Sequence, residues 1–309
     1  MIAASIALGL AGRTRFPAAG STPGGGSRPE PADDPIQRPI PSSGEQLPVI
    51  GMGTWQTFDV GGNQGARAGL RDVLRTFVER GGRVIDSSPM YGTSEAVYGD
   101  LAAELGLGDR MFTATKVWTR GREAGIAQME ASLKKMRVAR LDLMQVHNLL
   151  DVATHLRTLR AWRDEGRIRY LGVTHYLESA HEDVARVIRS EPIDVVQINY
   201  SLDERGAERR LLPLALERGV AVIVNRPFGG GGLFGRVRGR PLPPWAAEYD
   251  VSSWAQLFLK FVVSHPAVTC VISGTSNPKH VIDNLGAGYG RLPDPDQTQR
   301  MEAVVRGLM

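Results

Sequence analysis

Four side chains in the first half of the sequence have the chemistry needed to move a proton together. They are a carboxylate, a phenol, an amine and an imidazole, and each lies at or just after the end of a short apolar run: Asp86, Tyr91, Lys116 and His147. If these runs are parallel strands of one barrel, the four side chains converge on the rim where barrel enzymes carry out their chemistry. We therefore interpret them as a candidate acid–base site.

A carbonyl group that accepts a hydride also needs a proton, and Tyr91 is the candidate donor. The pKa of an unperturbed tyrosine is about 10, which is too high for easy donation at neutral pH. A nearby cation lowers that pKa by stabilising the phenolate, and Lys116 is the expected cation. Asp86 would keep Lys116 charged and in place. His147 would bind the carbonyl oxygen and orient it, and general acid catalysis of this kind contributes roughly 10²- to 10⁴-fold.

Each of these residues taken alone has a simpler interpretation. Asp86 and Lys116 could form a buried structural ion pair. His147 could be a hydrogen-bonded core histidine, and Tyr91 could be a packing residue. A carboxylate, a phenol, an amine and an imidazole seldom gather at one rim for packing alone, so their combination favours the catalytic interpretation.

The elements that must position these residues alternate along the chain from Pro48 onward. Short apolar runs, the expected strands, are separated by helical patterns, which indicates βαβ units and a parallel sheet. Eight strands in about 265 residues favour a single-domain (β/α)8 TIM barrel in the α/β class. The expected strands are Val49 to Gly53, Arg83 to Asp86, Met111 to Lys116, Leu141 to His147, Ile168 to Thr174, Val195 to Tyr200, Val220 to Asn225 and Val268 to Ile272. The expected helices are Ala66 to Arg80, Ser94 to Leu105, Arg122 to Arg137, Ala153 to Glu165, Ser179 to Arg189, Ala207 to Arg218, Ser252 to Ser264 and Gln297 to Leu308.

Residues 1–44 differ in composition from the rest of the chain. An alanine-rich apolar stretch, Ile2 to Ala11, precedes a segment rich in Pro, Gly and Ser, a composition that buries little surface. The stretch has the length of the apolar part of a signal peptide but lacks preceding basic residues. We expect 1–44 to be a disordered tail of a cytoplasmic protein, or the remnant of an export signal that begins upstream of Met1. The barrel domain is expected to span 45–309.

Composition argues against several classes of partner. The net charge is +4 and no dense run of Lys and Arg is present, so nucleic acid is not an expected ligand. No apolar stretch reaches about 18 residues, so no membrane-spanning helix is expected. The single cysteine, Cys270, lies in an apolar run and is expected in the core. No metal site is expected, and a monomer is slightly favoured.

Residues 48–290 resemble the aldo/keto reductase family in the order and spacing of their motifs. Asp86 to Gly92 is similar to the family's Asp-x-Ala-x-x-Tyr-Gly motif, and Asp142 to His147 is similar to its Asp-Leu-x-x-x-His motif. All four candidate residues then fall on the family's catalytic tetrad. The other matching segments are Gly51 to Trp55, Thr115 to Trp118, Gly172 to Tyr176 and Gly274 to Asn284.

This resemblance implies an enzyme that reduces an aldehyde or ketone with NADP(H), or with NAD(H). It also implies where each part of the cofactor lies. Gly53 is expected to contact the cofactor. The other expected residues are Thr54, Trp55 and Asp86 near the nicotinamide ribose, Thr174, His175 and Gln197 at the carboxamide, Asn225, Arg226, Phe228 and Gly229 after the seventh strand, and Gly274, Thr275, Lys279, His280, Asp283 and Asn284 at the adenine end. The walls of the substrate pocket are expected to be Trp55, Tyr91, Trp118 and His147.

The segment after the seventh strand departs from the family pattern. Asn225 or Arg226 must replace a tyrosine that stacks on the nicotinamide in the family, and an Arg guanidinium can stack. Gly230 to Gly235 spells the G-x-G-x-x-G fingerprint but is not expected to open a helix, so we reject a Rossmann interpretation. A flexible loop over the pyrophosphate is expected instead, with Arg226, Arg236 and Arg238 nearby.

The adenine segment also departs from the family pattern. Gly274 and His280 stand where the family commonly has a lysine and an arginine that bind the 2′-phosphate of NADP(H). Lys279 is adjacent, and Thr275 and Ser276 offer hydroxyl groups. The sequence therefore predicts a preference for NADPH over NADH, but a reduced one.

Two other functions fit parts of the pattern. A non-catalytic regulatory subunit would bind cofactor with negligible turnover and keep a stable protein partner, although the intact tetrad argues against it. A Schiff-base aldolase would use Lys116 as its nucleophile. Asp86 disfavours this second alternative because it would hold the lysine protonated.

Overall fold

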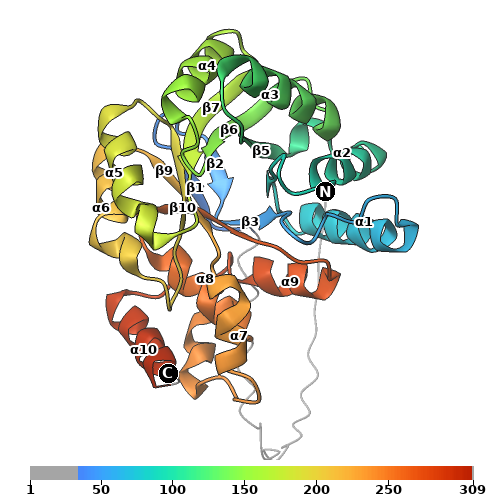
Figure 1. The fold of residues 1–309 in the computed structure, drawn as a ribbon. Helices are drawn as coiled ribbons and strands as arrows, with labels where there is room; N and C mark the ends of the chain where they lie inside the picture. Colours follow the sequence, from blue (N-terminus) through green and yellow to red (C-terminus); the bar gives the residue numbers. More distant parts are fainter. Residues whose placement is uncertain (1–33, 308–309) are drawn as a thin grey trace, which may run out of the picture. The chain divides into compact units, whose positions relative to one another are not determined.

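A computed structural model describes residues 34–307 and places a closed barrel of eight parallel strands at their centre (Figure 1). Each strand pairs in parallel with both neighbours, and the last strand closes the barrel by pairing with the first. The expected (β/α)8 class is thus confirmed. The barrel strands are β3 (Ile50–Gly53), β4 (Val84–Asp86), β5 (Phe112–Val117), β6 (Leu141–His147), β7 (Ile168–Thr174), β8 (Val195–Asn199), β9 (Ala221–Asn225) and β10 (Val268–Ser273).

The helices lie outside the barrel, and most of them pack against its strands or against other helices. In α1 (Gln64–Glu79), Leu70, Leu74 and Phe77 recur three or four residues apart and are buried. Asn63 caps this helix by accepting a hydrogen bond from the backbone N–H of Ala66. The other helices are α2 (Ser94–Glu104), α3 (Arg122–Met136), α4 (Val152–Asp164), α5 (His181–Ser190), α6 (Leu211–Arg218), α7 (Gly232–Arg236), α8 (Trp254–Ser264), α9 (Pro278–Gly286) and α10 (Pro295–Arg306). Of these, α3, α4, α6 and α8 pack against the strands, α9 packs against α1 and α8, and α10 packs against α8.

Within residues 34–307, no helix has the length and apolar character needed to span a membrane. The expected helices match α1 to α6, α8 and α10 to within a few residues, except that Ala207 to Arg218 divides into a 3₁₀ helix at Gly206–Arg209 and α6. The sequence analysis missed α9 and α7. The expectation that Gly230 to Gly235 opens no helix was wrong, since α7 begins at Gly232. This five-residue helix follows a strand of a closed barrel, so it belongs to no Rossmann unit.

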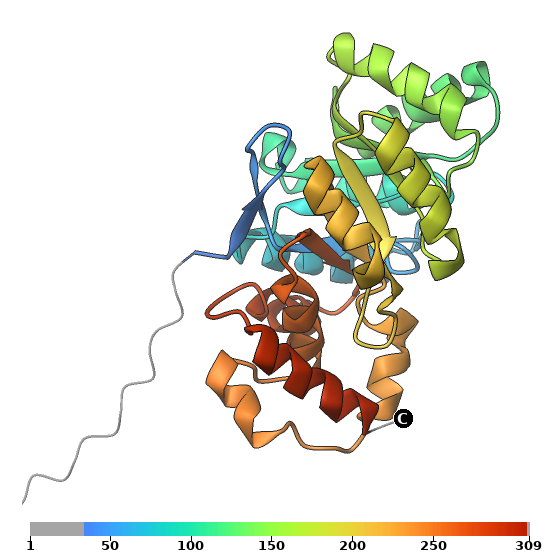
Figure 2. The same ribbon diagram turned by 90° about the vertical axis from the view of Figure 1, so that its left-hand side faces the viewer.

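A hairpin precedes the barrel, where a disordered segment was expected. β1 (Gln37–Pro39) pairs antiparallel with β2 (Gln46–Pro48), and Figure 2 shows this hairpin in blue beside the barrel strands. Ile40 is fully buried in one cluster with barrel residues, and Arg38 donates hydrogen bonds to the carbonyl oxygens of His265 and Val268. The expectation of disorder was therefore wrong for residues 34–44. Residues 1–33 lie outside the described part of the chain.

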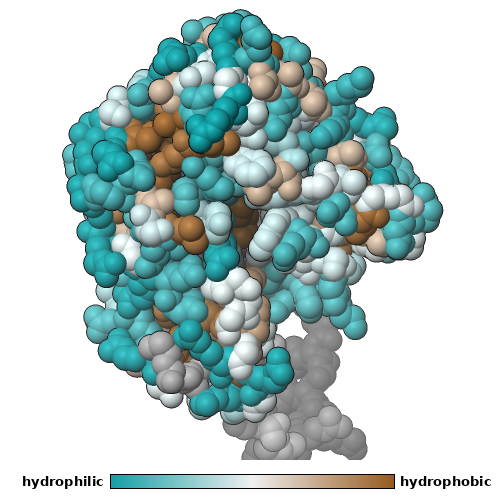
Figure 3. All heavy atoms as spheres, in the orientation of Figure 1, coloured by the Kyte–Doolittle hydropathy of each residue, from teal (hydrophilic) through white to brown (hydrophobic). Residues whose placement is uncertain are grey.

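The helical layer leaves a cavity of about 310 Å³ between α4 and α5. Figure 3 shows hydrophobic residues gathered at the surface between these two helices. None of the four candidate catalytic side chains lines this cavity. Its walls are Leu149, Val152, Ala153, Leu156, Asp183, Arg186, Val187, Ser190 and Glu191.

Candidate active site

The barrel brings the four predicted catalytic residues to one rim. Asp86 and His147 are the last residues of β4 and β6, Lys116 is the next-to-last residue of β5, and Tyr91 lies in the loop before α2. The Lys116 Nζ lies 2.5 Å from Asp86 Oδ2 and 5.1 Å from the centre of the Tyr91 ring. The rings of Tyr91 and His147 meet edge to face at 6.0 Å. The structure thus joins residues that are up to 61 positions apart in the sequence (147 − 86).

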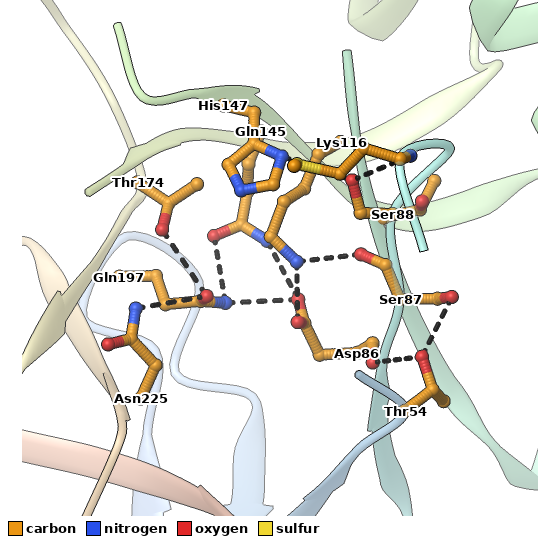
Figure 4. Close-up of polar contacts among 12 residues, drawn as sticks. Thr54, Asp86, Ser87, Ser88, Lys116, Gln145, His147, Thr174, Gln197 and Asn225 are labelled. Carbon is orange, nitrogen blue, oxygen red and sulfur yellow. Dashed lines mark hydrogen bonds and ion pairs between the residues drawn. The ribbon is translucent and has the colours of Figure 1, made fainter. Parts of the chain in front are cut away.

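The carboxylate of Asp86 is held by three side-chain donors, all of them buried. Lys116 binds one oxygen, whereas Gln145 and Gln197 donate to the other at 3.1 and 3.0 Å. Lys116 also donates to the backbone carbonyl of Ser87 at 2.6 Å (Figure 4). A buried ion pair with its remaining hydrogen-bonding capacity used in this way keeps both charges in a fixed geometry.

Burial and charge act in opposite directions on Lys116 and Tyr91. Burial alone would lower the pKa of Lys116, but the charge of Asp86 and the proximity of Tyr91 raise it above its usual value. Burial raises the pKa of Tyr91, and the charge of Lys116 opposes this shift without cancelling it. The expectation that Lys116 lowers the tyrosine pKa was therefore right about the direction of that one interaction and wrong about the net shift.

His147 is electrically neutral at physiological pH. Burial, followed by the positive charge of Lys116 and the proximity of His175, lowers its pKa to about 2. Its Nδ1 lies 3.0 Å from the hydroxyl oxygen of Ser88, which is also buried. A neutral imidazole at this position can orient a carbonyl oxygen through a single N–H group.

The sequence analysis missed Ser87, Ser88 and Gln145. Gln145 lies two residues before His147 on β6, and alternate residues of a strand face the same side, so this periodicity could have revealed it. Ser88 replaces the alanine of the family motif, and that substitution was the available signal. No comparable signal existed for Ser87. Its contact with Lys116 is made by the backbone carbonyl oxygen, which every residue has.

Several expected cofactor residues form a hydrogen-bonded row beside the tetrad. Thr54 Oγ1 lies 2.9 Å from Ser87 Oγ, and Thr174 donates to Gln197 Oε1 at 3.3 Å. Asn225 donates to the same Gln197 oxygen at 3.4 Å (Figure 4). Gln197 therefore links this row to the carboxylate of Asp86.

His175 has a different environment from Thr174. Its ring stacks on Tyr176 at 5.7 Å, and its Nδ1 accepts a hydrogen bond from the backbone N–H of Leu177. Its carbonyl oxygen accepts a hydrogen bond from Asn225. The backbone of His175, and not its ring, is thus joined to the row.

The end of β9 and the segment after it carry two arginines and an asparagine with buried, unpartnered polar atoms. Asn225 points back toward Gln197, whereas Arg226 has a left-handed backbone (φ 53°) and its guanidinium lies 3.4 Å from Glu204. Arg236 pairs with Asp203 at 3.4 Å. Within residues 34–307, Asn225 Oδ1, Arg226 Nε and Arg236 Nη1 are buried without a hydrogen-bond partner.

Unpartnered guanidinium nitrogens in such a place fit the pyrophosphate of a dinucleotide, since Arg binds phosphate through charge-assisted hydrogen bonds. Phe228 and Gly229 belong to the same turn, and the backbone N–H of Gly229 bonds to the carbonyl of Arg226. Arg238, also expected here, is exposed.

The expected adenine end lies at the start of α9. Thr275 Oγ1 lies 3.3 Å from His280 Nδ1, and the side chain of Lys279 is exposed. Asn284 donates to Ser273 Oγ at 3.1 Å. Asp283 accepts a hydrogen bond from Gln256 of α8, so its carboxylate is engaged between two helices. Gly274 follows β10 and is exposed.

Large apolar side chains surround the tetrad on the loops that follow the strands. Trp118 is 40% exposed and its ring lies 6.4 Å from that of His147, and Trp55 is 52% exposed. These two tryptophans are part of a larger group of exposed apolar residues that follow barrel strands, in loops except for Phe234, which lies in α7. The group consists of Trp55, Met90, Trp118, Tyr176, Leu177 and Phe234.

The fold and the rim define a (β/α)8 barrel with a tyrosine, a lysine, an aspartate and a histidine in contact at one end. A model of the aldo/keto reductase family matches residues 49–306. The chain therefore belongs to the aldo/keto reductase family.

Characterised relatives and solved structures agree with this assignment. The chain is 29% identical over 245 residues to methylglyoxal reductase YeaE of Escherichia coli, which covers 76% of this chain and 84% of the relative. It is 27% identical over 216 residues to aldo-keto reductase YhdN of Bacillus subtilis, and the match covers 64% of this chain and 63% of that relative. An aldo/keto reductase of Klebsiella pneumoniae, solved with NADP and acetate, has a TM-score of 0.72 at 24% identity, covering 84% of this chain and 92% of that one. At this identity the structural likeness concerns the fold.

Proposed function

We propose that this protein reduces aldehydes or ketones to alcohols with NADPH, using Tyr91 as the proton donor. The observation that carries the proposal is the contact of Tyr91 with a buried, charged Lys116 and a neutral His147. The raised pKa of Tyr91 keeps the phenol protonated before the reaction, and the nearby charge of Lys116, which acts to lower that pKa, would stabilise the phenolate that donation leaves behind.

Each side chain has a distinct role in this proposal. His147 donates a hydrogen bond to the carbonyl oxygen of the substrate and orients it toward Tyr91. As the oxygen gains negative charge, Tyr91 transfers its phenolic proton to that oxygen, and the cation of Lys116 stabilises the phenolate that remains. Asp86 keeps Lys116 charged and in position. When bound, the nicotinamide supplies the hydride.

The residues at the cofactor end fit NADP(H). The unpartnered nitrogens of Arg226 and Arg236 would hold the pyrophosphate, and Thr275, Lys279 and His280 would surround the 2′-phosphate. The Klebsiella pneumoniae structure with NADP supports the same choice by likeness of fold. Trp55 and Trp118 would form apolar walls for the substrate.

The geometry of Lys116 argues against Schiff-base chemistry. A Schiff base forms only from an unprotonated amine, whereas Asp86 and Tyr91 raise the pKa of Lys116. The amine also donates to two oxygen atoms, Asp86 Oδ2 and the Ser87 carbonyl, which restrict it further.

The proposal is tested by following cofactor oxidation with NADPH and with NADH over a panel of aldehydes and ketones. The panel should include methylglyoxal and bulkier aromatic aldehydes, because one relative is a methylglyoxal reductase and the proposed pocket walls, Trp55 and Trp118, are aromatic. We expect turnover with at least one carbonyl. Cofactor binding with no turnover across the panel would favour a regulatory subunit. Trapping of a substrate on Lys116 by borohydride would favour an aldolase.

A further inference from the structure

The hydroxyl group of Ser88 is the hydrogen-bond partner of the Nδ1 atom of the His147 ring. Ser88 Oγ lies 3.0 Å from His147 Nδ1 (Figure 4). Ser88 is fully buried and His147 is 6% exposed, so water does not compete freely for this contact. The family motif has alanine at this position, which offers no hydroxyl group.

The direction of the hydrogen bond follows from the other contacts of Ser88. Its oxygen accepts a long hydrogen bond, 3.4 Å, from the backbone N–H of Met90. Across residues 34–307, His147 Nδ1 is the one acceptor available to the hydroxyl hydrogen. A buried hydroxyl without an acceptor is unfavourable, so Ser88 donates to Nδ1. In a neutral imidazole the proton must then be on Nε2.

We propose that Ser88 is a positioning residue that keeps His147 in the tautomer with its proton on Nε2. This inference rests on the proposed carbonyl reduction, in which His147 must donate a hydrogen bond. In the other tautomer Nε2 carries a lone pair, which repels a carbonyl oxygen. Ser88 therefore acts on the substrate through His147 and touches no reacting atom itself.

The tautomer is measured directly by ¹⁵N NMR of histidine-labelled protein, without substrate or turnover. A His147→Gln variant identifies the His147 signals, and Ser132→Ala is the matched control. Ser132 is also a fully buried serine, but its hydroxyl bonds to a carbonyl of its own helix. We expect the Nε2–H form in the wild type and in Ser132→Ala, and a shift toward the Nδ1–H form in Ser88→Ala. A wild-type Nδ1–H form, or an unchanged tautomer in Ser88→Ala, would overturn the inference.

Kinetics then test whether the tautomer matters for positioning. Loss of one hydrogen bond of this kind should lower kcat/KM for carbonyl reduction by about tenfold in Ser88→Ala. The Kd for NADPH should not change, and Ser132→Ala should match the wild type in both quantities. A shifted tautomer with unchanged kcat/KM would refute the positioning role. Absence of reduction in the wild type would refute the proposed function, whereas the NMR result would still decide the tautomer.

Discussion

At the scale of single residues, the proton of Tyr91 is controlled by a competition between burial and charge. Removal of the phenol from water disfavours its ionised form, and Lys116 offsets only part of this effect. The phenol consequently stays protonated before the reaction. In the proposed reaction the same lysine would stabilise the phenolate once the proton has left, so one cation would serve the site without ionising the donor in advance.

Removing the phenolic oxygen should abolish most of the activity while the ring keeps its packing. For Tyr91→Phe we expect kcat/KM for carbonyl reduction to fall by about 10²- to 10⁴-fold, with an unchanged Kd for NADPH. Tyr289→Phe is the control, because its hydroxyl bonds to the Arg80 carbonyl, remote from the tetrad. Near-normal turnover in Tyr91→Phe would exclude Tyr91 as the proton donor.

The pH dependence of reduction should reflect the same two shifts. The pKa of His147 is lowered to about 2, so this group stays neutral through the physiological range and contributes no step near pH 6.5. The pKa of Tyr91 is raised, so activity should fall only at alkaline pH, above about 10, where the phenol loses its proton. The measurement is kcat at saturating cofactor and substrate. A step near 6.5 that disappears in His147→Gln would contradict this account.

The ion pair between Lys116 and Asp86 should matter for stability as well as for activity. Lys116→Met leaves the carboxylate buried without its cation, which should lower the free energy of unfolding by about 3–5 kcal/mol. Adding Asp86→Asn removes the uncompensated charge and should restore much of that loss, but not the activity. Denaturant unfolding of the two variants tests this. Equal free energies of unfolding for the wild type and Lys116→Met would show that the buried Asp86 carboxylate does not need the Lys116 cation for stability.

At the scale of elements, α9 supplies the groups that would select the cofactor. Its first turn carries Lys279 and His280, and His280 already bonds to Thr275. The helix also accepts a hydrogen bond from Gln256 of α8 through Asp283, which fixes its orientation. The proposed 2′-phosphate site would therefore be built from a strand end and one helix start, with Lys279 as its adjacent permanent cation.

We accordingly expect a preference for NADPH over NADH of about tenfold to a hundredfold in kcat/KM, or roughly 1.4–2.7 kcal/mol. Lys279→Ala should reduce this preference, because a charge-assisted hydrogen bond to phosphate contributes on the order of 1.5–3 kcal/mol. Lys134→Ala, an exposed lysine on α3, is the control and should leave the ratio unchanged. A wild-type enzyme that prefers NADH would refute this description of the phosphate site.

At the scale of the whole described chain, the hairpin and the barrel share one hydrophobic cluster. Ile40 and Leu47 of the hairpin segment are buried with Val84 and Phe112 of the barrel. The carboxylate of Glu45 also binds Arg169 of β7. The hairpin is thus packed against the barrel and shares its hydrophobic core.

Truncation should separate the hairpin from the residues that precede it. A chain that begins at Asp34 should melt like the full-length protein. A chain that begins at Glu45 loses β1, Arg38 and the buried Ile40, and its Tm should fall by several degrees, since burial of an isoleucine side chain contributes about 1.5–3 kcal/mol. The measurement is the Tm of both truncated chains and of the full-length protein, with cofactor binding checked for each. An unchanged Tm for the shorter chain would show that the hairpin contributes no stability.

Local patterns in the sequence determine the barrel and the polar side chains that gather at its rim. Apolar runs that alternate with helical periodicity indicate eight βα units, and residues at the ends of such runs must meet at one rim. Asp86, Tyr91, Lys116 and His147 could therefore be predicted together before any coordinates were known. The hairpin could not, because Pro-rich segments look flexible unless a partner surface such as that around Ile40 exists to bury them.

Tertiary structure alone decides the quantities that depend on several elements at once. Whether the pKa of Tyr91 rises or falls depends on how much protein surrounds it compared with how near Lys116 lies, and neither can be read from spacing along the chain. The same holds for the contact of Ser88 with His147 across 59 residues. Sequence determines which groups are present at the rim, whereas packing determines which proton each of them holds.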